Sequence, residues 1–180
     1  VDCHSRFEEF TAHLVAEQLE KLSIGWFEEP LGPNSESEEL KRVSSLIAMP
    51  VAGGESGYGE AFFTSLLNHG ALDIIMPDLK YCGGAAEAVA AGQSAVALGK
   101  GFSIHSPSGP ISLLSSGHAT AAVDGAMFLE HAIDEVDWRP EIIQPAEQVE
   151  NGQLLINRTP GLGSRLNLDL VSSKGDHLII

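Results

Sequence analysis

The stretch Leu72-Asp73-Ile74-Ile75-Met76-Pro77-Asp78 decides the fold of this chain. Its apolar centre predicts a short buried strand that ends at an acid. Gly83-Gly84 then open an alanine-rich segment that continues to about Leu98 and is stopped by Gly99, which predicts a helix. A buried strand followed by a single helix is the unit from which parallel α/β sheets are built.

The same unit recurs along the chain, with an acid or a histidine after each strand. Six such side chains stand 26, 27, 23, 27 and 25 residues apart, namely Asp2, Glu28, Glu55, Asp78, His105 and Glu130. This spacing predicts a (β/α) barrel, in which side chains at the C-terminal ends of successive strands meet in one mouth. The first of the six strands is the short end at Val1-Asp2, and the last covers residues 126–130.

Six strands do not close an eight-stranded barrel, and a complete barrel of this type has about 250 residues. The chain has 180 residues. We therefore predict an α/β fold that is a partial (β/α)8 TIM-type barrel of about six βα units, strands 3–8, with the first strands missing. Residues 1–145 are assigned to the barrel domain and residues 146–180 to a C-terminal tail. In that tail, Glu150-Asn151-Gly152-Gln153 predicts a hairpin turn.

The composition narrows the class of function. The formal net charge is −15, which argues against binding to nucleic acid or to an anionic membrane. An anionic substrate would need a local cation at its site. No apolar run is long enough to span a bilayer. The two cysteines, Cys3 and Cys82, do not form a disulfide framework, so we expect a reduced, cytoplasmic setting.

Three of the recurring acids form a candidate metal site. Asp2, Glu28 and Glu55 follow neighbouring strands, and three carboxylates make a hard, all-oxygen ligand set that suits Mg²⁺. Zinc is disfavoured because the sequence has no His/Cys quartet with zinc spacing. Side chains alternate along Trp26-Phe27-Glu28-Glu29-Pro30, so only one of the two glutamates points into the mouth. The alternative is that each of these acids is solvated surface.

The remaining polar side chains form a candidate set for proton transfer. A carboxylate such as Asp78 fixes the tautomer of a neighbouring imidazole, which makes the other nitrogen of His105 a better base. His4 faces the same way as Asp2 on an extended strand and is a candidate for handling protons. Glu130 is a candidate for bonding a substrate oxygen. The alternatives are a structural histidine at His105 and a surface acid at Glu130.

These residues resemble the C-terminal barrel domain of the enolase superfamily, mandelate racemase subgroup. The resemblance extends from Val1 to about Gly163 and is closest to the acid-sugar dehydratases, galactonate dehydratase in particular. It rests on Val1-Asp2-Cys3-His4-Ser5-Arg6, Trp26-Phe27-Glu28-Glu29-Pro30, Gly54-Glu55, Asp73-Ile74-Ile75-Met76-Pro77-Asp78, Gly83-Gly84, His105-Ser106-Pro107-Ser108-Gly109-Pro110 and Pro160-Gly161-Leu162-Gly163.

The resemblance implies a role for each matching residue. The acids matching Asp2, Glu28 and Glu55 bind Mg²⁺, and the pair matching Asp78 and His105 is the base dyad. The histidine matching His4 is the general acid that protonates the leaving hydroxyl. The family also has an N-terminal capping domain that closes over the substrate. We expect that domain to be missing here and the tail, residues 146–180, to pack on it.

The resulting hypothesis is a Mg²⁺-dependent hydro-lyase. It would remove the proton next to the carboxylate of an aldonic acid such as galactonate and eliminate the 3-hydroxyl, giving a 2-keto-3-deoxy acid. One alternative is a racemase or epimerase of a 2-hydroxy acid on the same metal site. The other is an inactive fragment that only binds metal, and we expect the isolated piece to be inactive. The full-length protein is expected to form a homo-oligomer.

Overall fold

A short parallel sheet forms the centre of the fold. The structure is a computed structural model that describes residues 1–32, 37–133 and 136–174. The strands are β1 (Phe27–Glu28), β2 (Val51–Gly53), β3 (Ile74–Ile75) and β4 (Gly101–Phe102), in the order β1-β2-β3-β4. Every neighbouring pair is parallel, with Phe27 opposite Val51, Ala52 opposite Ile74 and Ile75 opposite Phe102. The strands are therefore aligned, and the segments that follow them leave from one edge.

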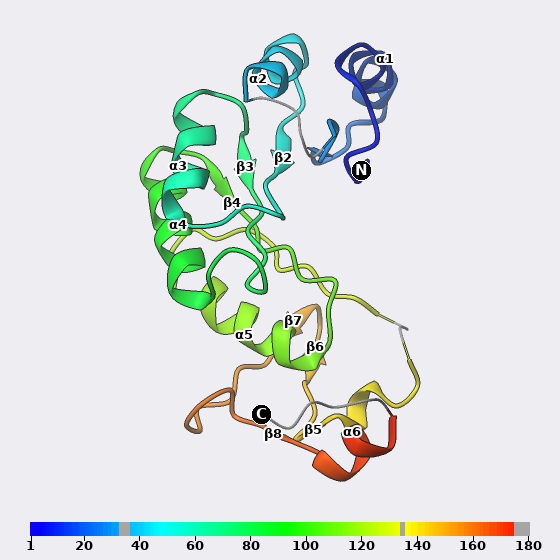
Figure 1. Ribbon diagram of the computed structural model, residues 1–180, viewed down its shortest axis with the longest axis vertical. Helices are drawn as coiled ribbons and strands as arrows, with labels where there is room; N and C mark the ends of the chain where they lie inside the picture. Colours follow the sequence, from blue (N-terminus) through cyan, green and yellow to red (C-terminus); the bar gives the residue numbers. More distant parts are fainter. Residues whose placement is uncertain (33–36, 134–135, 175–180) are drawn as a thin grey trace.

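Helices lie along the outer side of this sheet, so that strand and helix alternate around an open arc (Figure 1). The predicted βα rhythm is confirmed over β1 to β4. The helices are α1 (Glu9–Leu19), η1 (Glu20–Leu22), α2 (Ser37–Leu46), α3 (Glu60–Asn68), α4 (Ala85–Ala97), α5 (Pro110–Ala121), η2 (Arg139–Glu141) and α6 (Leu168–Lys174), where η denotes a 3₁₀ helix.

The main core lies between the sheet and helices α3, α4 and α5. Phe63, Ile75 and Phe102 are fully buried there, together with the alanines on the inner side of α4. Gly92 of α4 allows the closest approach, because a Cβ at this position would lie 2.9 Å from three ring carbons of Phe102. Small residues thus let the helix pack directly on the strand.

Two of the six predicted strands are not strands in the structure. Val1-Asp2 makes only an isolated parallel bridge, with Asp2 opposite Glu28. Residues 126–130 are not in a strand, so that prediction is wrong, although the segment runs beside β4. The backbone N–H of Met127 donates to the Phe102 carbonyl at 2.8 Å, and the Ser103 hydroxyl donates to the Phe128 carbonyl at 2.7 Å. A single backbone hydrogen bond aligns the segment without making a ladder.

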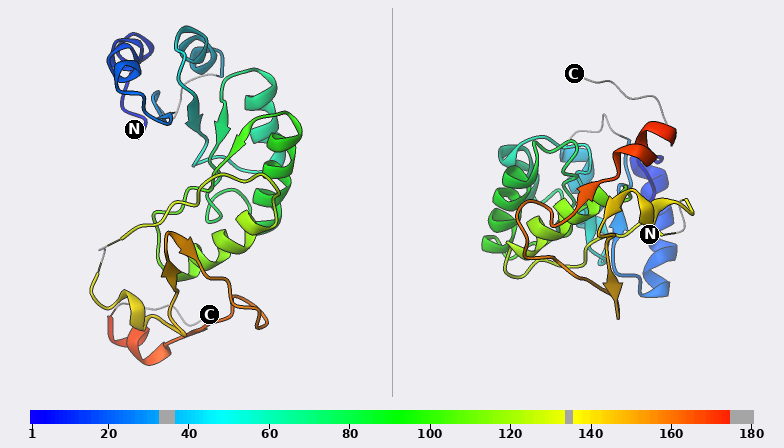
Figure 2. Two further views of the ribbon diagram at one scale, coloured as in Figure 1. Left: turned by 180° about the vertical axis from the view of Figure 1, so that it is seen from behind. Right: turned by 90° about the horizontal axis from the view of Figure 1, so that it is seen from below.

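The C-terminal part contains two antiparallel pairs, and Figure 2 shows this part of the chain from behind and from below. β5 (Ile143–Gln144) pairs with β8 (Arg165–Leu166), and β6 (Val149–Glu150) pairs with β7 (Gln153–Leu154). The predicted hairpin turn is confirmed: Asn151 and Gly152 both have positive φ, of 52° and 75°, as a two-residue hairpin requires. Leu154 then packs against α5.

In the described part of the chain, helices are either too short or too polar to cross a membrane.

Candidate active site

The best-defined pair in the site is Asp78 with His105. Asp78 follows β3, His105 follows β4, and the backbone N–H of His105 donates to the Pro77 carbonyl at 3.2 Å, which ties the two strand ends together. The Asp78 Oδ2 lies 2.8 Å from His105 Nδ1. Nε2, on the other side of the ring, lies 3.2 Å from Glu55 Oε2. The imidazole therefore bridges two carboxylates, one behind it and one in front.

Asp78 is held as a carboxylate. Its side chain is fully buried. Burial by itself would raise the pKa of Asp78, but hydrogen bonds from Lys80 and His105 outweigh that effect and hold the pKa below its usual value. An ionised Asp78 accepts the Nδ1 proton of His105, which leaves Nε2 as the nitrogen available for proton transfer.

Glu55 faces this imidazole from the loop after β2. Burial raises the pKa of Glu55, and the negative charges of Glu29 and Asp2 raise it further, against the opposing effect of His105 and His4. The carboxylate is thus close enough to other acids to be repelled by them. Such a concentration of negative charge next to a histidine favours a bound cation.

Asp2 and Glu28 lie side by side across the first bridge. Glu28 is only 9% exposed, and its Oε2 accepts a hydrogen bond of 2.7 Å from Trp26 Nε1. Burial raises the pKa of Glu28, the Trp26 bond opposes this, and Asp2 and Glu130 raise it further. The negative charges of Asp2, Glu28 and Glu130 are therefore close to one another at this edge.

His4 stays close to Asp2 but not on an extended strand. Its φ is 51°, in the left-handed region, and its backbone N–H donates to Asp2 Oδ1 at 2.7 Å. The His4 Nδ1 lies 3.7 Å from Asp2 Oδ2. The expected alternation along the strand is wrong here because the chain turns after Asp2, yet the turn keeps the imidazole beside the acid.

Glu130 holds the loop that carries the dyad histidine. Its Oε2 accepts a 2.8 Å hydrogen bond from the backbone N–H of Ser106, the residue after His105. A role in bonding a substrate oxygen stays a prediction. In the structure, this hydrogen bond joins the segment of residues 126–130, which runs beside β4, to the loop that follows β4.

The two glutamates of the Glu28-Glu29 pair point to different partners. Glu29 has a φ of 41° and turns its carboxylate to the loop after β2, where Oε1 accepts hydrogen bonds from the backbone N–H groups of Gly54 at 2.6 Å and Glu55 at 3.3 Å. Its Oε2 accepts from the Ser5 hydroxyl at 3.1 Å. Glu29 thus ties together the loops that carry Asp2 and Glu55.

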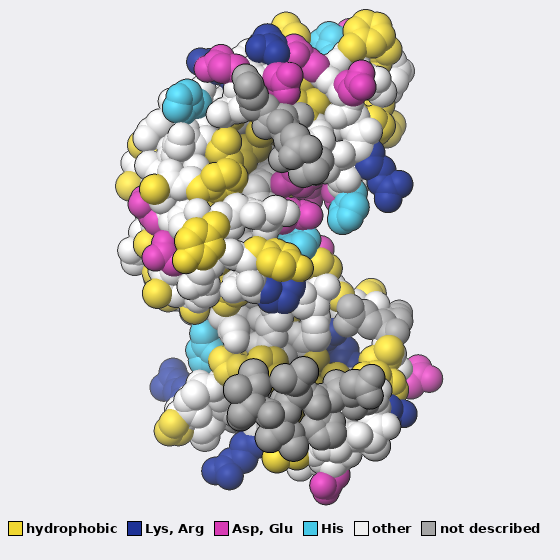
Figure 3. Space-filling model, in the orientation of Figure 1, with side chains coloured by type: hydrophobic (Ala, Val, Ile, Leu, Met, Phe, Trp, Pro, Cys, Tyr) yellow, Lys and Arg dark blue, Asp and Glu magenta, His cyan; other side chains and the backbone are white. Residues whose placement is uncertain are grey.

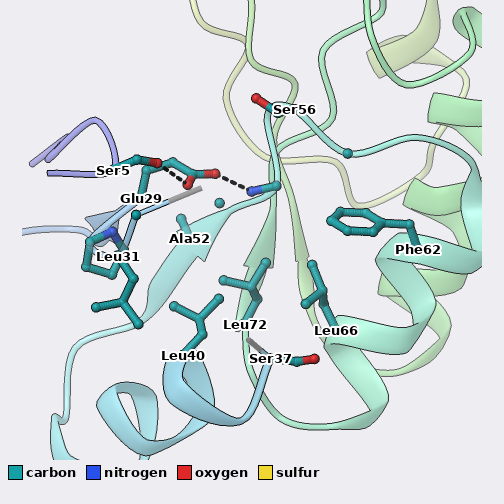
Figure 4. Close-up of a pocket in the computed structure, with 15 residues that line it drawn as sticks. Ser5, Glu29, Leu31, Ser37, Leu40, Ala52, Ser56, Phe62, Leu66 and Leu72 are labelled. Carbon is teal, nitrogen blue, oxygen red and sulfur yellow. Dashed lines mark hydrogen bonds between the residues drawn. The ribbon is translucent and has the colours of Figure 1, made fainter. Parts of the chain in front are cut away.

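Figure 4 shows this arrangement at the rim of a cavity of about 290 Å³. Glu29 lies at its polar end, and apolar side chains such as Leu40, Leu66 and Leu72 line its other end. A Cβ at Gly53 would lie 2.9 Å from Glu29 Oε1, so a larger residue there would require the Glu29 carboxylate to shift. The alternation of side chains along a strand predicts that one of the two glutamates turns away from the site. It does not predict that Glu29 hydrogen-bonds the loops that carry Asp2 and Glu55.

A second group of residues that the sequence analysis does not identify supports the dyad from behind. The Lys80 ammonium donates to Asp78 Oδ2 at 2.6 Å and also to the Ser108 hydroxyl. The Arg139 guanidinium, from η2, donates to the Ser108 carbonyl at 2.9 Å and to Glu147 at 2.7 Å. The only sequence signal for this group is a lysine two residues after the dyad acid.

The donor chemistry of the site fits a hard cation. Asp2, Glu28 and Glu55 supply carboxylate oxygens only, and burial and mutual repulsion raise the pKa values of Glu28 and Glu55. In the structure, however, these acids are not yet close enough together to hold a metal ion. Among residues 1–32, 37–133 and 136–174 there is no group of three or more His, Cys, Asp or Glu side chains arranged for this. Glu28 is turned to Trp26 and Glu55 to His105.

Figure 3 shows acidic and histidine side chains gathered in a hollow on one side of the molecule. The hollow lies between the part built on the sheet and the C-terminal part. The acids and the His105 imidazole therefore lie on a face that solvent reaches.

Comparison with known proteins gives a consistent result. Over residues 1–170 the chain matches the family described as "Enolase C-terminal domain-like". It is 31% identical over 172 residues to D-xylonate dehydratase of Haloferax volcanii, a match that covers 96% of the chain and 42% of the relative. It is 30% identical over 164 residues to arabinonate dehydratase of Saccharolobus solfataricus, a match that covers 91% of the chain and 43% of the relative. It is 26% identical over 183 residues to D-galactonate dehydratase of Xanthomonas campestris pv. campestris, a match that covers 98% of the chain and 48% of the relative.

Solved structures agree with these relatives. A mandelate racemase/muconate lactonizing enzyme-like protein from Roseovarius sp. TM1035 superposes with a TM-score of 0.91 at 26% identity, covering 98% of this chain and 44% of that one. The chain thus spans about half the length of the curated relatives it matches.

Proposed function

The chain belongs to the Enolase C-terminal domain-like family, and from that premise we propose that it is the barrel portion of a Mg²⁺-dependent acid-sugar dehydratase. The substrate would be an aldonic acid of the kind named for its relatives, xylonate, arabinonate or galactonate. The observation that carries the proposal is the His105 imidazole, held at Nδ1 by Asp78 and directed at Nε2 toward Glu55.

Asp2, Glu28 and Glu55 are the residues that would hold the metal. When bound, Mg²⁺ would hold the substrate carboxylate and neutralise the charge that develops as the neighbouring proton leaves, as in enolase-superfamily sites in general. Because Glu28 and Glu55 already repel their acidic neighbours, a cation among them also relieves an unfavourable interaction of the protein itself.

The proton transfers are assigned to two histidines. His105 Nε2 takes the proton from C2 of the substrate, and Asp78 stabilises the imidazolium that results. The C3–oxygen bond then breaks with its electron pair on the oxygen, and His4 supplies the proton with which the hydroxyl leaves as water. The enol that remains tautomerises to a 2-keto-3-deoxy acid. Glu130 holds the His105 loop and would bond a substrate oxygen.

The test uses the full-length protein with Mg²⁺ and three aldonic acids, xylonate, arabinonate and galactonate. Release of keto acid is measured chemically, and exchange of the C2 proton of the remaining aldonic acid for deuterium is measured by NMR in D₂O. We expect His105→Asn to abolish both signals, because the base is gone. His69→Asn is the matched control, since His69 is exposed at the end of α3 and its ring contacts Ser65 of that helix.

Two results would contradict the proposal. One is release of keto acid at the wild-type rate by the His105→Asn protein. The other is deuterium incorporation at C2 by the wild-type protein without any keto acid, which would identify a racemase or epimerase instead.

A further inference from the structure

Lys80 holds both oxygens of the Asp78 carboxylate. Its backbone N–H donates to Oδ1 at 2.8 Å, and its ammonium donates to Oδ2 at 2.6 Å. The same Oδ2 is the atom 2.8 Å from His105 Nδ1. A carboxylate fixed at both oxygens has one orientation, and here that orientation presents Oδ2 to the imidazole.

Lys80 also connects the two loops that carry the dyad. Its ammonium donates to the Ser108 hydroxyl, three residues after His105, while Lys80 itself lies two residues after Asp78. The Ser108 carbonyl is in turn held by Arg139 at 2.9 Å. The loop after β3 and the loop after β4 are therefore joined at a point directly behind the Asp78–His105 contact.

The charge balance makes this contact stronger than an ordinary surface pair. The Asp78 side chain has no exposed surface, whereas that of Lys80 is 38% exposed. A buried carboxylate needs a partner charge or several hydrogen bonds, and Lys80 supplies both here. The burial of Asp78 thus depends on the lysine as much as on the histidine.

We propose that Lys80 is a positioning residue for proton abstraction, acting through Asp78 to keep His105 as the tautomer that carries its proton on Nδ1. This inference rests on the proposed function, in which His105 is the base. Lys80 needs no contact with substrate for this role. Its loss would leave Asp78 held by one backbone N–H and the imidazole alone, so that the ring could turn or change tautomer.

The protein offers a matched control at the opposite end of the same strand. Lys100 Nζ lies 2.8 Å from Asp73 Oδ1, and Asp73 precedes β3 just as Asp78 follows it. The two lysines have similar exposure, 30% and 38%. Lys80→Met and Lys100→Met therefore each remove one lysine–aspartate pair anchored to β3, but only the first is next to the dyad.

The experiment compares the full-length, Mg²⁺-loaded wild-type protein with Lys80→Met, Lys80→Arg and Lys100→Met. We expect Lys80→Met to lower kcat by on the order of 10- to 100-fold, the scale of a misplaced catalytic group, with KM nearly unchanged. Lys100→Met should keep the wild-type kcat. Lys80→Arg should recover most of the loss, because a guanidinium also donates to carboxylate oxygens. Circular dichroism at the assay temperature checks that each variant is folded.

A second readout does not depend on turnover. In protein labelled with ¹⁵N-histidine, the nitrogen shifts of His105 at fixed pH report its tautomer. We expect Nδ1 to carry the proton in the wild-type and Lys100→Met proteins, and a mixture of tautomers in Lys80→Met. If Lys80→Met shows the mixture and the wild-type protein shows the single tautomer, but no aldonic acid is turned over, the proposed function fails while the positioning role stands.

Three outcomes would overturn the inference. The first is a Lys80→Met protein with unchanged kcat and unchanged histidine shifts. The second is an effect on KM alone, which would make Lys80 a substrate-binding residue. The third is an equal loss of kcat in Lys80→Met and Lys100→Met, which would reduce Lys80 to a contributor to general stability.

Discussion

Removing Arg139 from its ion pair with Glu147 should strongly destabilise the C-terminal part. Arg139 Nε lies 2.7 Å from Glu147 Oε1, and the two side chains are only 9% and 8% exposed. The second carboxylate oxygen, Oε2, is buried with no hydrogen-bond partner in the part of the chain that is described. Arg139→Met would therefore leave a buried negative charge with little to compensate it.

Breaking a buried pair by removing one partner costs about 3–5 kcal/mol, because the remaining charge stays desolvated. We expect Arg139→Met to lower the free energy of unfolding of the full-length protein by that amount. A double variant, Arg139→Met with Glu147→Leu, should be more stable than the single variant, because it removes the orphaned charge as well. Urea unfolding followed by circular dichroism measures both.

The matched control is an arginine–glutamate pair of similar length at the surface. Arg42 makes two contacts of 2.8 Å with Glu9, but the side chains are 52% and 38% exposed. Exposed pairs contribute little because water screens them, so Arg42→Met should change the unfolding curve only slightly. The reasoning is refuted if Arg139→Met costs no more than Arg42→Met, or if the double variant is less stable than Arg139→Met alone.

Two further changes test the core and the acidic edge. Gly92→Ala should lower the free energy of unfolding by about 1 kcal/mol, because overpacking against Phe102 outweighs the helix propensity gained; Gly25→Ala, where a Cβ meets nothing within 4 Å, should cause no loss. Burial raises the pKa of Glu28 above its ordinary value of 4.5, so the native state binds this proton more tightly than the unfolded state does. The free energy of unfolding therefore falls as the pH rises from 4.5 through the native pKa of Glu28. In metal-free protein, Glu28→Gln should thus raise the melting temperature relative to wild type more at pH ~7 than at pH ~4.5, and an equal gain at both would contradict this.

Much of the fold can be predicted from the sequence because it depends on local patterns. The apolar runs at β1 to β4, with the acids and the histidine that come with them, mark one edge of a parallel sheet. Membership of the enolase superfamily is confirmed. The strand predicted at residues 126–130 is wrong, because an apolar run identifies a buried segment but not whether enough hydrogen bonds form to make a ladder.

The contacts that support the site could not be predicted in this way. The direction of Glu29 depends on a positive φ and on a loop 25 residues away, and the contact between Lys80 and Ser108 joins segments 28 residues apart. Such pairs leave no periodic trace in the sequence. They depend on the spacing of neighbouring strand ends, which is known only once the sheet has formed.

The brevity of the strands has a consequence for how such a protein can diversify. Each of β1 to β4 is two or three residues long, and Glu55, Asp78 and His105 lie beyond the last paired residue of their strands. The parallel sheet therefore determines only where each of these loops begins. Substitution of a few residues that hold these loops, such as Glu29 or Lys80, can therefore change the chemistry of the site. The sheet and the core beneath the loops need not change.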